Sequence, residues 1–221
     1  MASDIDTPAR TGAWSRNGRR CLWTAITAVW LFGAAAGLSV LWRFDNAPGI
    51  GANAPARWPA DSVLTRAPGQ PTLVLLAHPQ CSCTRASLDE LGEALARART
   101  RPRTYVLFLK PEGFSNGWEQ TDSWRIAAAL PGVTPVRDDS GREARRFGVA
   151  TSGQTLLYDA DGTLLFSGGI TAARGHAGDN AGRSELVSLL TRGQSARPGA
   201  LNLGQSVHDA TRVFGCPLFG I

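Results

Sequence analysis

The residues best suited to chemistry in this chain are two cysteines, Cys81 and Cys83, separated by a single serine. An apolar stretch typical of a buried strand, residues 73–77, ends shortly before them, and an amphipathic helix with Leu88 and Leu91 on its apolar face follows them. The cysteines therefore fall at a helix N-terminus, where free backbone N–H groups and the helix dipole favour a negative charge. Because the thiolate is the reactive form of cysteine, the pattern predicts a redox or metal site. Two inert structural thiols are the alternative.

The opposite face of this helix is predicted to be polar, with Asp89, Glu90 and Glu93 on the outer side. Either Thr84 or a capping box at residues 87–90 is expected to begin the helix. Both features are signals of the fold rather than of chemistry.

Two further residues could take part in this chemistry. His78, three residues before Cys81, either tunes that thiol or caps the end of the strand. Cys216 lies in an apolar run at residues 213–219, which should dock on the domain because such a run is costly to leave in water. Cys216 could resolve a disulfide formed at the pair, complete a metal site, or remain a buried inert thiol. If the close pair suffices for exchange, a Cys216→Ser variant should retain most of the activity.

The remaining pattern predicts one α/β domain. Strands are expected at 104–110, 154–159 and 163–168, and helices at 121–130, 141–147 and 181–192. The Asp-Gly pair at 161–162 indicates a hairpin between the last two strands, and Pro131 and Pro135 are expected to break the chain. Counted from the strand before the cysteines, the order is β-α-β-α-β-β-α.

This order, with a cysteine pair at the first strand-to-helix turn, resembles the thioredoxin fold over residues 61–193. That fold is a central sheet with helices on both faces. FGV at 147–149, TLLY at 155–158 and the glycine pair at 168–169 follow the second half of thioredoxin in order and spacing. The segments HPQCSCTRAS, FGVATSGQTLLYD, GGITAARGHAGDN and VFGCPLF are similar to a group of membrane-anchored bacterial thioredoxin-like proteins called RedB.

The resemblance implies roles for the site residues. We expect Cys81, as the first and more exposed cysteine, to be the nucleophile, and Cys83 to resolve the mixed disulfide. By analogy with thioredoxin, the loop at 169–180 approaches the cysteines, so His176 could act as an acid, a base or a ligand. The alternative is a loop histidine that is hydrogen-bonded locally by Asp179.

Two departures from thioredoxin matter. One residue instead of two separates the cysteines, so a disulfide between Cys81 and Cys83 closes a small, strained ring that is easily reduced. Thioredoxins also carry a cis-proline before the strand at 154–159, where this chain has Gln154. That proline shapes the groove facing the cysteines and discourages metal capture. Its absence weakens the case for a plain disulfide reductase and favours metal binding.

The N-terminal part of the chain predicts a membrane anchor. Arg10, Arg16, Arg19 and Arg20 precede an uncharged apolar run at 21–42, which is long enough to cross a bilayer at about 20 residues per crossing. The basic flank should stay in the cytoplasm, so the rest of the chain faces the periplasm or the cell exterior. A cleavable signal peptide is the competing interpretation, although its apolar region would span only about 7–15 residues.

The expected organisation is a cytoplasmic tail at 1–20, an anchor at 21–42, a linker at 43–60, the thioredoxin-like domain at 61–193 and a docking tail at 194–221. The formal net charge is +5, and arginines cluster at 97–103. Nucleic acid is not expected as a partner, because the domain faces outward and cations are ordinary at a helix C-terminus. The sequence also lacks motifs for nucleotide use, zinc proteolysis and serine hydrolysis.

The leading hypothesis is a membrane-anchored thiol–disulfide oxidoreductase without a cofactor, acting on protein thiols or disulfides outside the cytoplasm. Gln154 and His78 are expected to border its substrate. The alternative is a copper-binding or copper-delivery protein, because thiolates suit Cu(I). Its expected ligands are Cys81, Cys83, His176 and Cys216.

Overall fold

The computed structural model describes residues 16–192 and 211–219. The chain divides into two compact units, one ending at Phe44 and one beginning at Asp45. The first contains most of helix α1 (Arg16–Asp45), which has a mean hydropathy of 1.8 over its most apolar window. By length and composition, α1 is the one helix in the described ranges that could cross a membrane, as an anchor or as a signal segment.

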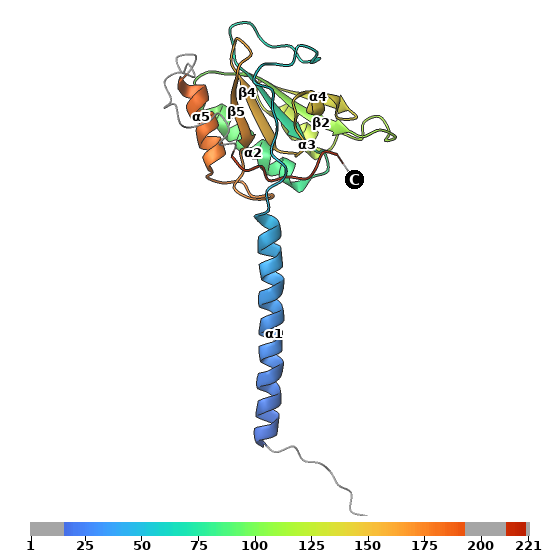
Figure 1. Ribbon diagram of the computed structural model, residues 1–221, viewed down its shortest axis with the longest axis vertical. Helices are drawn as coiled ribbons and strands as arrows, with labels where there is room; N and C mark the ends of the chain where they lie inside the picture. Colours follow the sequence, from blue (N-terminus) through green and yellow to red (C-terminus); the bar gives the residue numbers. More distant parts are fainter. Residues whose placement is uncertain (1–15, 193–210, 220–221) are drawn as a thin grey trace, which may run out of the picture. The chain divides into compact units, whose positions relative to one another are not determined.

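The second unit is a mixed α/β domain built on a five-stranded sheet (Figure 1). Its elements are β1 (Thr72–Ala77), α2 (Ser82–Arg97), β2 (Arg103–Lys110), α3 (Asp122–Ala129), β3 (Val133–Asp139), α4 (Arg142–Arg146), β4 (Gln154–Tyr158), β5 (Leu164–Gly169) and α5 (Ala181–Arg192). The strand order is β3-β2-β1-β4-β5, with β1, β2 and β3 parallel, β4 antiparallel to β1, and β5 antiparallel to β4. The predicted fold class is confirmed.

Strand β3 is an element that the sequence pattern did not indicate. The chain was expected to break between Pro131 and Pro135, yet Val133–Asp139 pairs in parallel with β2, and Pro135 lies opposite Val106. A proline is tolerated here because β3 is at the edge of the sheet, where the missing N–H costs no ladder hydrogen bond on the open side. The segment around Pro131 therefore ends helix α3, and strand β3 begins directly after it.

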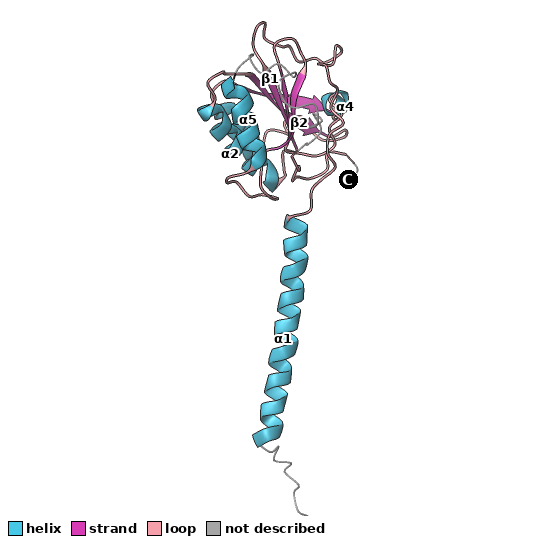
Figure 2. Ribbon diagram, turned by 60° about the vertical axis from the view of Figure 1, so that its left-hand side comes forward, coloured by secondary structure: helices cyan, strands magenta, loops and turns pink. Residues whose placement is uncertain are grey.

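Helices cover the two faces of the sheet unequally. Figure 2 shows α2 and α5 on one face and the short helix α4 on the other. Alternate residues of the central strand β1 serve the two cores: Leu73 and Leu75 face the α2 and α5 side, whereas Val74 and Leu76 face the other. This alternation is what a strand with both faces covered requires.

The face with α4 is completed by segments from both ends of the domain. Trp58 packs edge-on against Phe147 and Tyr158, with ring centroids 5.1 and 5.2 Å apart, and Leu218 belongs to the same core. Trp58 lies in the stretch expected to be a linker, at 43–60. That part of the chain is therefore packed on the sheet, where its aromatic ring covers apolar surface.

Candidate functional site

The two cysteines lie at the turn between β1 and α2, where the sequence pattern put them. Helix α2 begins at Ser82, and Cys81 is its N-cap residue, with φ −92° and ψ 126°. The turn is closed on the carbonyl oxygen of His78, which accepts from the N–H of Cys81 (3.1 Å) and from the hydroxyl of Thr84 (2.8 Å). The expected starts at Thr84 and at 87–90 were wrong, because backbone bonds of the turn begin the helix earlier.

Burial does not distinguish the two thiols. Cys81 is 5% exposed and Cys83 is 4% exposed, so the expectation that Cys81 is the more accessible one is not met. All cysteines in the described ranges are free thiols, which makes this the reduced form of the site. What separates Cys81 from Cys83 is its electrostatic surroundings.

The C-terminal segment, described at residues 211–219, brings a third thiol to the pair. Its backbone runs antiparallel to residues 150–152: the N–H of Ser152 donates to the carbonyl oxygen of Cys216 (2.9 Å), and the N–H of Leu218 donates to that of Ala150 (2.8 Å). The side chain of Cys216 is half-buried, and it lies close enough to Cys81 to help lower the pKa of that thiol. Three thiols therefore meet at the start of α2.

Close packing fixes this segment against the domain. Gly215 touches the backbone of Ser152 so closely that an added Cβ would lie 1.8 Å from the Ser152 carbonyl oxygen. Val213, Phe214 and Leu218 are buried apolar anchors on either side of Cys216. Their burial explains why the apolar run at 213–219 docks rather than staying in water.

The loop at 169–180 also reaches the cysteines, but not through the residue that the sequence singled out. The guanidinium of Arg174 donates to the carbonyl oxygen of Gly215 (2.7 Å) and to that of Ala47 (3.2 Å). The backbone of Gly175 lies near Cys83 and acts to lower the pKa of that thiol. The sequence puts Arg174 in the loop expected near the cysteines but gives it no role, since its partners are backbone carbonyls from distant segments.

A buried ion pair holds this loop in place. Glu90 of α2 is 2% exposed and accepts from the guanidinium of Arg183 (2.6 Å), from the side-chain amide of Asn180 (3.2 Å) and from the N–H of Gly178. The prediction that Glu90 faces water was wrong, because Arg183 of α5 supplies the opposite charge inside the domain. Asp179, the expected partner of His176, pairs with Arg183 instead.

The thiol of Cys81 is acidic because hydrogen-bond donors converge on its sulfur. The pKa of Cys81 is lowered to about 5, mainly because the thiol of Cys83 donates to it. The thiol and backbone N–H of Cys216 and the backbone N–H of Cys83 add to this effect, while burial opposes it. A helix N-terminus favours the same charge.

The two donor thiols are shifted the other way. The pKa of Cys83 is raised, first because its thiol donates to Cys81 and then because it is buried. Burial raises the pKa of Cys216 to about 11, and its contact with Cys81 adds to the shift, whereas the charge of Arg174 acts in the opposite direction. One thiolate and two thiols are therefore the stable arrangement near neutral pH.

His78 and Gln154 border the site as buried polar residues. The Nδ1 atom of His78 accepts from the N–H of Gln80 (3.3 Å), and its ring meets Trp118 edge-on at 5.8 Å. Burial lowers the pKa of His78, so the neutral ring is favoured. Gln154 donates to the hydroxyl of Ser167 (3.0 Å). Among the described residues, neither Nε2 of His78 nor Oε1 of Gln154 has a hydrogen-bond partner. Their assignment to substrate binding stays a prediction.

His176 is exposed, and the expected four-ligand metal site is not assembled. Across residues 16–192 and 211–219, no group of three or more His, Cys, Asp or Glu side chains is arranged to hold a metal ion. The donor chemistry of Cys81, Cys83 and Cys216 suits a soft ion, but the described geometry does not form a coordination site. A catalytic role for His176 stays a prediction.

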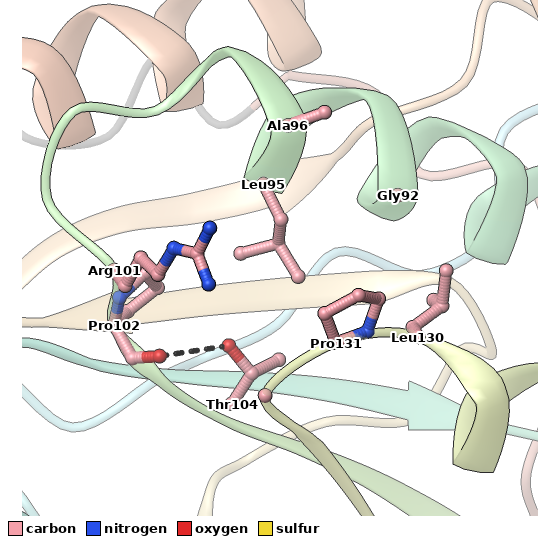
Figure 3. Close-up of a pocket in the computed structure, with 9 residues that line it drawn as sticks. Gly92, Leu95, Ala96, Arg101, Pro102, Thr104, Leu130 and Pro131 are labelled. Carbon is pink, nitrogen blue, oxygen red and sulfur yellow. Dashed lines mark hydrogen bonds between the residues drawn. The ribbon is translucent and has the colours of Figure 1, made fainter.

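A cavity of about 350 Å³ lies at the other end of α2 and has different chemistry (Figure 3). It is lined by Gly92 and Leu95 of α2, by Arg101, and by Leu130 after α3. The hydroxyl of Thr104 in its wall donates to the Pro102 carbonyl oxygen (3.2 Å). Arg101 is its single titratable lining residue, so the cavity offers no nucleophile for the redox chemistry.

Comparison with known proteins concerns the fold. No family model and no curated protein matches the chain. An uncharacterised conserved protein from Geobacillus kaustophilus has a similar structure, with a TM-score of 0.51 and 14% identity over 78% of this chain and 91% of that one. A hypothetical protein from Sinorhizobium meliloti has a TM-score of 0.47 and 17% identity, covering 78% and 93% of the two chains.

The exposed lipoprotein thioredoxin of Streptococcus pneumoniae is a more distant structure. It has a TM-score of 0.40 and 16% identity, and the match covers 54% of this chain and 82% of that one. The strand order β3-β2-β1-β4-β5 and the cysteine turn before α2 form the thioredoxin-like arrangement that the sequence predicted, a central sheet with helices on both faces.

Proposed function

We propose that this protein is a thiol–disulfide oxidoreductase of the RedB type, with Cys81 as the attacking residue of a Cys-x-Cys pair. The observation that carries the proposal is the place of Cys81 at the N-cap of α2, where the thiol of Cys83 donates to its sulfur and the pKa falls to about 5. Such a group is a thiolate at neutral pH, which is the form that attacks disulfides.

The reaction follows from these protonation states. The thiolate of Cys81 attacks one sulfur of a partner disulfide, a mixed disulfide forms, and the other partner sulfur leaves as a thiolate and takes up a proton. Cys83 then loses its proton and attacks the Cys81 sulfur, which releases the second partner thiol. The partner gains two electrons and two protons, and the protein keeps a Cys81–Cys83 disulfide. The reverse sequence oxidises a dithiol partner.

Helix α1 supports the proposed place of action, the outer side of the cytoplasmic membrane. Its length and composition support a membrane anchor, and Arg16, Arg19 and Arg20 at its start favour a cytoplasmic N-terminus. The domain then faces the periplasm or the cell exterior, where disulfides persist and protein thiols or disulfides are the available partners. Reporter fusions placed after residue 60 should be active only outside the cytoplasm, and a cytoplasmic signal would contradict this topology.

The acidic thiol provides the direct test. In reduced full-length protein, alkylation of Cys81 by iodoacetamide should rise with pH and reach half its maximal rate near pH 5, since the thiolate is the reacting species. Peptide mapping assigns the labelled residue, and Cys81→Ser should remove this inflection. A midpoint near that of an ordinary thiol, about pH 8.5, would remove the main support for the proposal.

Copper binding is the alternative function, and it must be distinguished from thiol–disulfide exchange by experiment. Three thiols suit Cu(I), although the described geometry forms no coordination site. Protein purified under reducing conditions should be analysed for metal content beside its activity with a small disulfide. If copper is the ligand, Gln154→Pro should lower Cu(I) affinity while circular dichroism stays unchanged. Stoichiometric copper with no exchange activity would favour the copper function.

A further inference from the structure

We propose that Cys216 is a second resolving thiol, so that a mixed disulfide on Cys81 is released by attack from the C-terminal segment as well as from Cys83. This inference rests on the proposed function, because it needs Cys81 to form mixed disulfides. It assigns a chemical role to residues 211–219, which the reaction of a close pair does not use.

The first argument is the shared position of the two thiols. Cys83 is two residues from Cys81, and the backbone of Cys216 is bonded to Ser152, whose hydroxyl binds the cysteine turn at His78. Both thiols therefore neighbour Cys81, and both lower its pKa. Cys83 is 4% exposed and lies in the first turn of α2, whereas Cys216 is half-buried and lies in an extended segment outside any helix. The two thiols therefore approach Cys81 from different elements.

The second argument is the geometry that a disulfide demands. Its bond lengths and torsions are narrow, and only Ser82 separates Cys81 from Cys83. Closing a Cys81–Cys83 bond through Ser82 alone therefore strains the first turn of α2. A Cys81–Cys216 bond joins two separate segments, so it closes no small ring within the first turn of α2.

The third argument is that the backbone around Cys216 is held from both sides. Arg174 binds the carbonyl oxygen of Gly215 (2.7 Å), and the N–H of Ser152 binds that of Cys216 (2.9 Å). The hydroxyl of Ser152 also accepts from the N–H of His78 (2.9 Å), in the turn that carries Cys81. One residue thus ties the C-terminal segment to the cysteine turn.

The fourth argument concerns the proton that a resolving thiol must lose. The charge of the Cys81 thiolate raises the pKa of both neighbouring thiols, and this effect ends once Cys81 is in a mixed disulfide. Arg174 still lowers the pKa of Cys216 at that stage. Cys216 is thus easier to deprotonate in the intermediate than in the resting site.

The step balances without another reagent. The thiolate of Cys216 attacks the Cys81 sulfur of the mixed disulfide, a Cys81–Cys216 bond forms, and the bond from Cys81 to the partner sulfur breaks. The partner sulfur leaves as a thiolate and takes up the proton that Cys216 gave up. The partner is reduced, and the protein is oxidised by the same two electrons as in resolution by Cys83.

The test compares single and double variants of the full-length chain. Reduced protein in detergent is mixed with oxidised glutathione, quenched in acid, and mapped for disulfides by mass spectrometry. In Cys83→Ser we expect a Cys81–Cys216 disulfide and release of both glutathione molecules. In Cys83→Ser/Cys216→Ser the reaction should stop at a stable Cys81–glutathione mixed disulfide. Cys21→Ser, which removes the cysteine of α1, is the matched control and should behave like the wild type.

Arg174 is tested as a positioning residue by the ratio of the two possible disulfides, which does not depend on the global stability of the fold. The measured quantity is the ratio of Cys81–Cys216 to Cys81–Cys83 disulfide after oxidation, in protein that keeps all three cysteines. Arg174→Ala should lower this ratio by about tenfold, the usual effect of a lost charged hydrogen bond. Arg174→Lys should restore part of that ratio. Arg125→Ala, at an exposed pair with Asp122, should leave it unchanged.

The outcomes separate this inference from the proposed function. If wild-type protein releases glutathione but Cys83→Ser stops at the mixed disulfide as the double variant does, Cys216 does not resolve and the inference fails alone. If wild-type Cys81 forms no mixed disulfide, the proposed function fails. If Cys83→Ser folds poorly, two other experiments answer the same question: disulfide mapping of Cys83→Ala and of acid-quenched wild-type protein. Absence of the Cys81–Cys216 disulfide in both would overturn the inference.

Discussion

Cys81 has one thiol neighbour from its own helix start and another from the far end of the chain, and the two are held in different ways. Cys83 is placed by the backbone of α2, only two residues away. Cys216 is placed by long-range contacts with Ser152 and Arg174, and by buried apolar anchors. The local neighbour is therefore fixed wherever the helix forms, whereas the remote one depends on several contacts that can be removed singly. The predictions below use this difference.

The largest effect should come from removing the thiolate that both neighbours share. Cys81→Ser should abolish exchange and mixed-disulfide formation, because neither Cys83 nor Cys216 has a lowered pKa. Cys83→Ser and Cys216→Ser should each retain reaction with oxidised glutathione. The three variants are compared by the amount of glutathione released per molecule of protein. A Cys81→Ser variant that still reacts would contradict the prediction.

Cys81→Ser should also change how stability depends on pH. The pKa of Cys81 falls from the ordinary range of a thiol, about 8.5–9, to about 5 in the folded protein, so between these values the unfolded chain binds one more proton at this site. This contribution is present in full above pH 9 and is lost as pH falls through 5. Urea unfolding of the reduced wild type should thus gain stability, relative to Cys81→Ser, as pH rises across that window. An equal pH slope in both proteins would speak against a lowered pKa.

The next largest effect should come from the ion pair beneath the loop that carries Arg174. Glu90→Gln removes the buried charge partner of Arg183, leaves it only the exposed Asp179, and should cost about 3–5 kcal/mol of unfolding free energy. Glu93→Gln is the matched control in the same helix: its exposed pair with Arg97 should be worth less than about 1 kcal/mol. Similar midpoints of urea unfolding for the two variants would show that Glu90 is not buried as described.

A smaller and more selective effect is expected where the C-terminal segment touches the domain. Gly215→Ala places a Cβ against the Ser152 carbonyl oxygen, so the segment must shift and Cys216 moves from Cys81. The yield of Cys81–Cys216 disulfide should fall while Cys81–Cys83 still forms. Gly51→Ala meets no atom within 4 Å and serves as the control. An unchanged ratio of the two disulfides would count against the docked segment.

The smallest effect is expected at His176. If its imidazole tunes the thiol, His176→Ala should slow exchange by about tenfold or less, at the low end for a lost acid–base group. Its exposed position favours the low end, because water screens its interaction with the buried thiols. Stopped-flow rates with oxidised glutathione measure this directly. A loss as large as that of Cys81→Ser would restore His176 to the centre of the mechanism.

Local pattern in the sequence was sufficient for the cysteine turn and for most of the fold. Two local patterns predict that a strand ends and a helix begins at the cysteine pair: the apolar run before Cys81, and the helical spacing of Leu88 and Leu91. Both leucines are fully buried, and Cys81 is the N-cap. This worked because hydrophobic periodicity and helix termini are properties of neighbouring residues. Strand β3 was missed, since Pro135 is compatible with a strand only at a sheet edge, which is not a local property.

Only the tertiary structure decided what surrounds the thiolate. Glu90 was expected in water from its helical position, and its burial depends on Arg183, which another helix supplies. Arg174 reaches the site through backbone carbonyls, which every residue has, so no residue type in the sequence marks that contact. Cys216 meets Cys81 because an extended segment pairs with residues 150–152 through main-chain hydrogen bonds. Because main-chain pairing depends little on which side chains are present, the sequence pattern does not reveal it. The sequence determined which thiols exist, and long-range packing determined that three of them share one site.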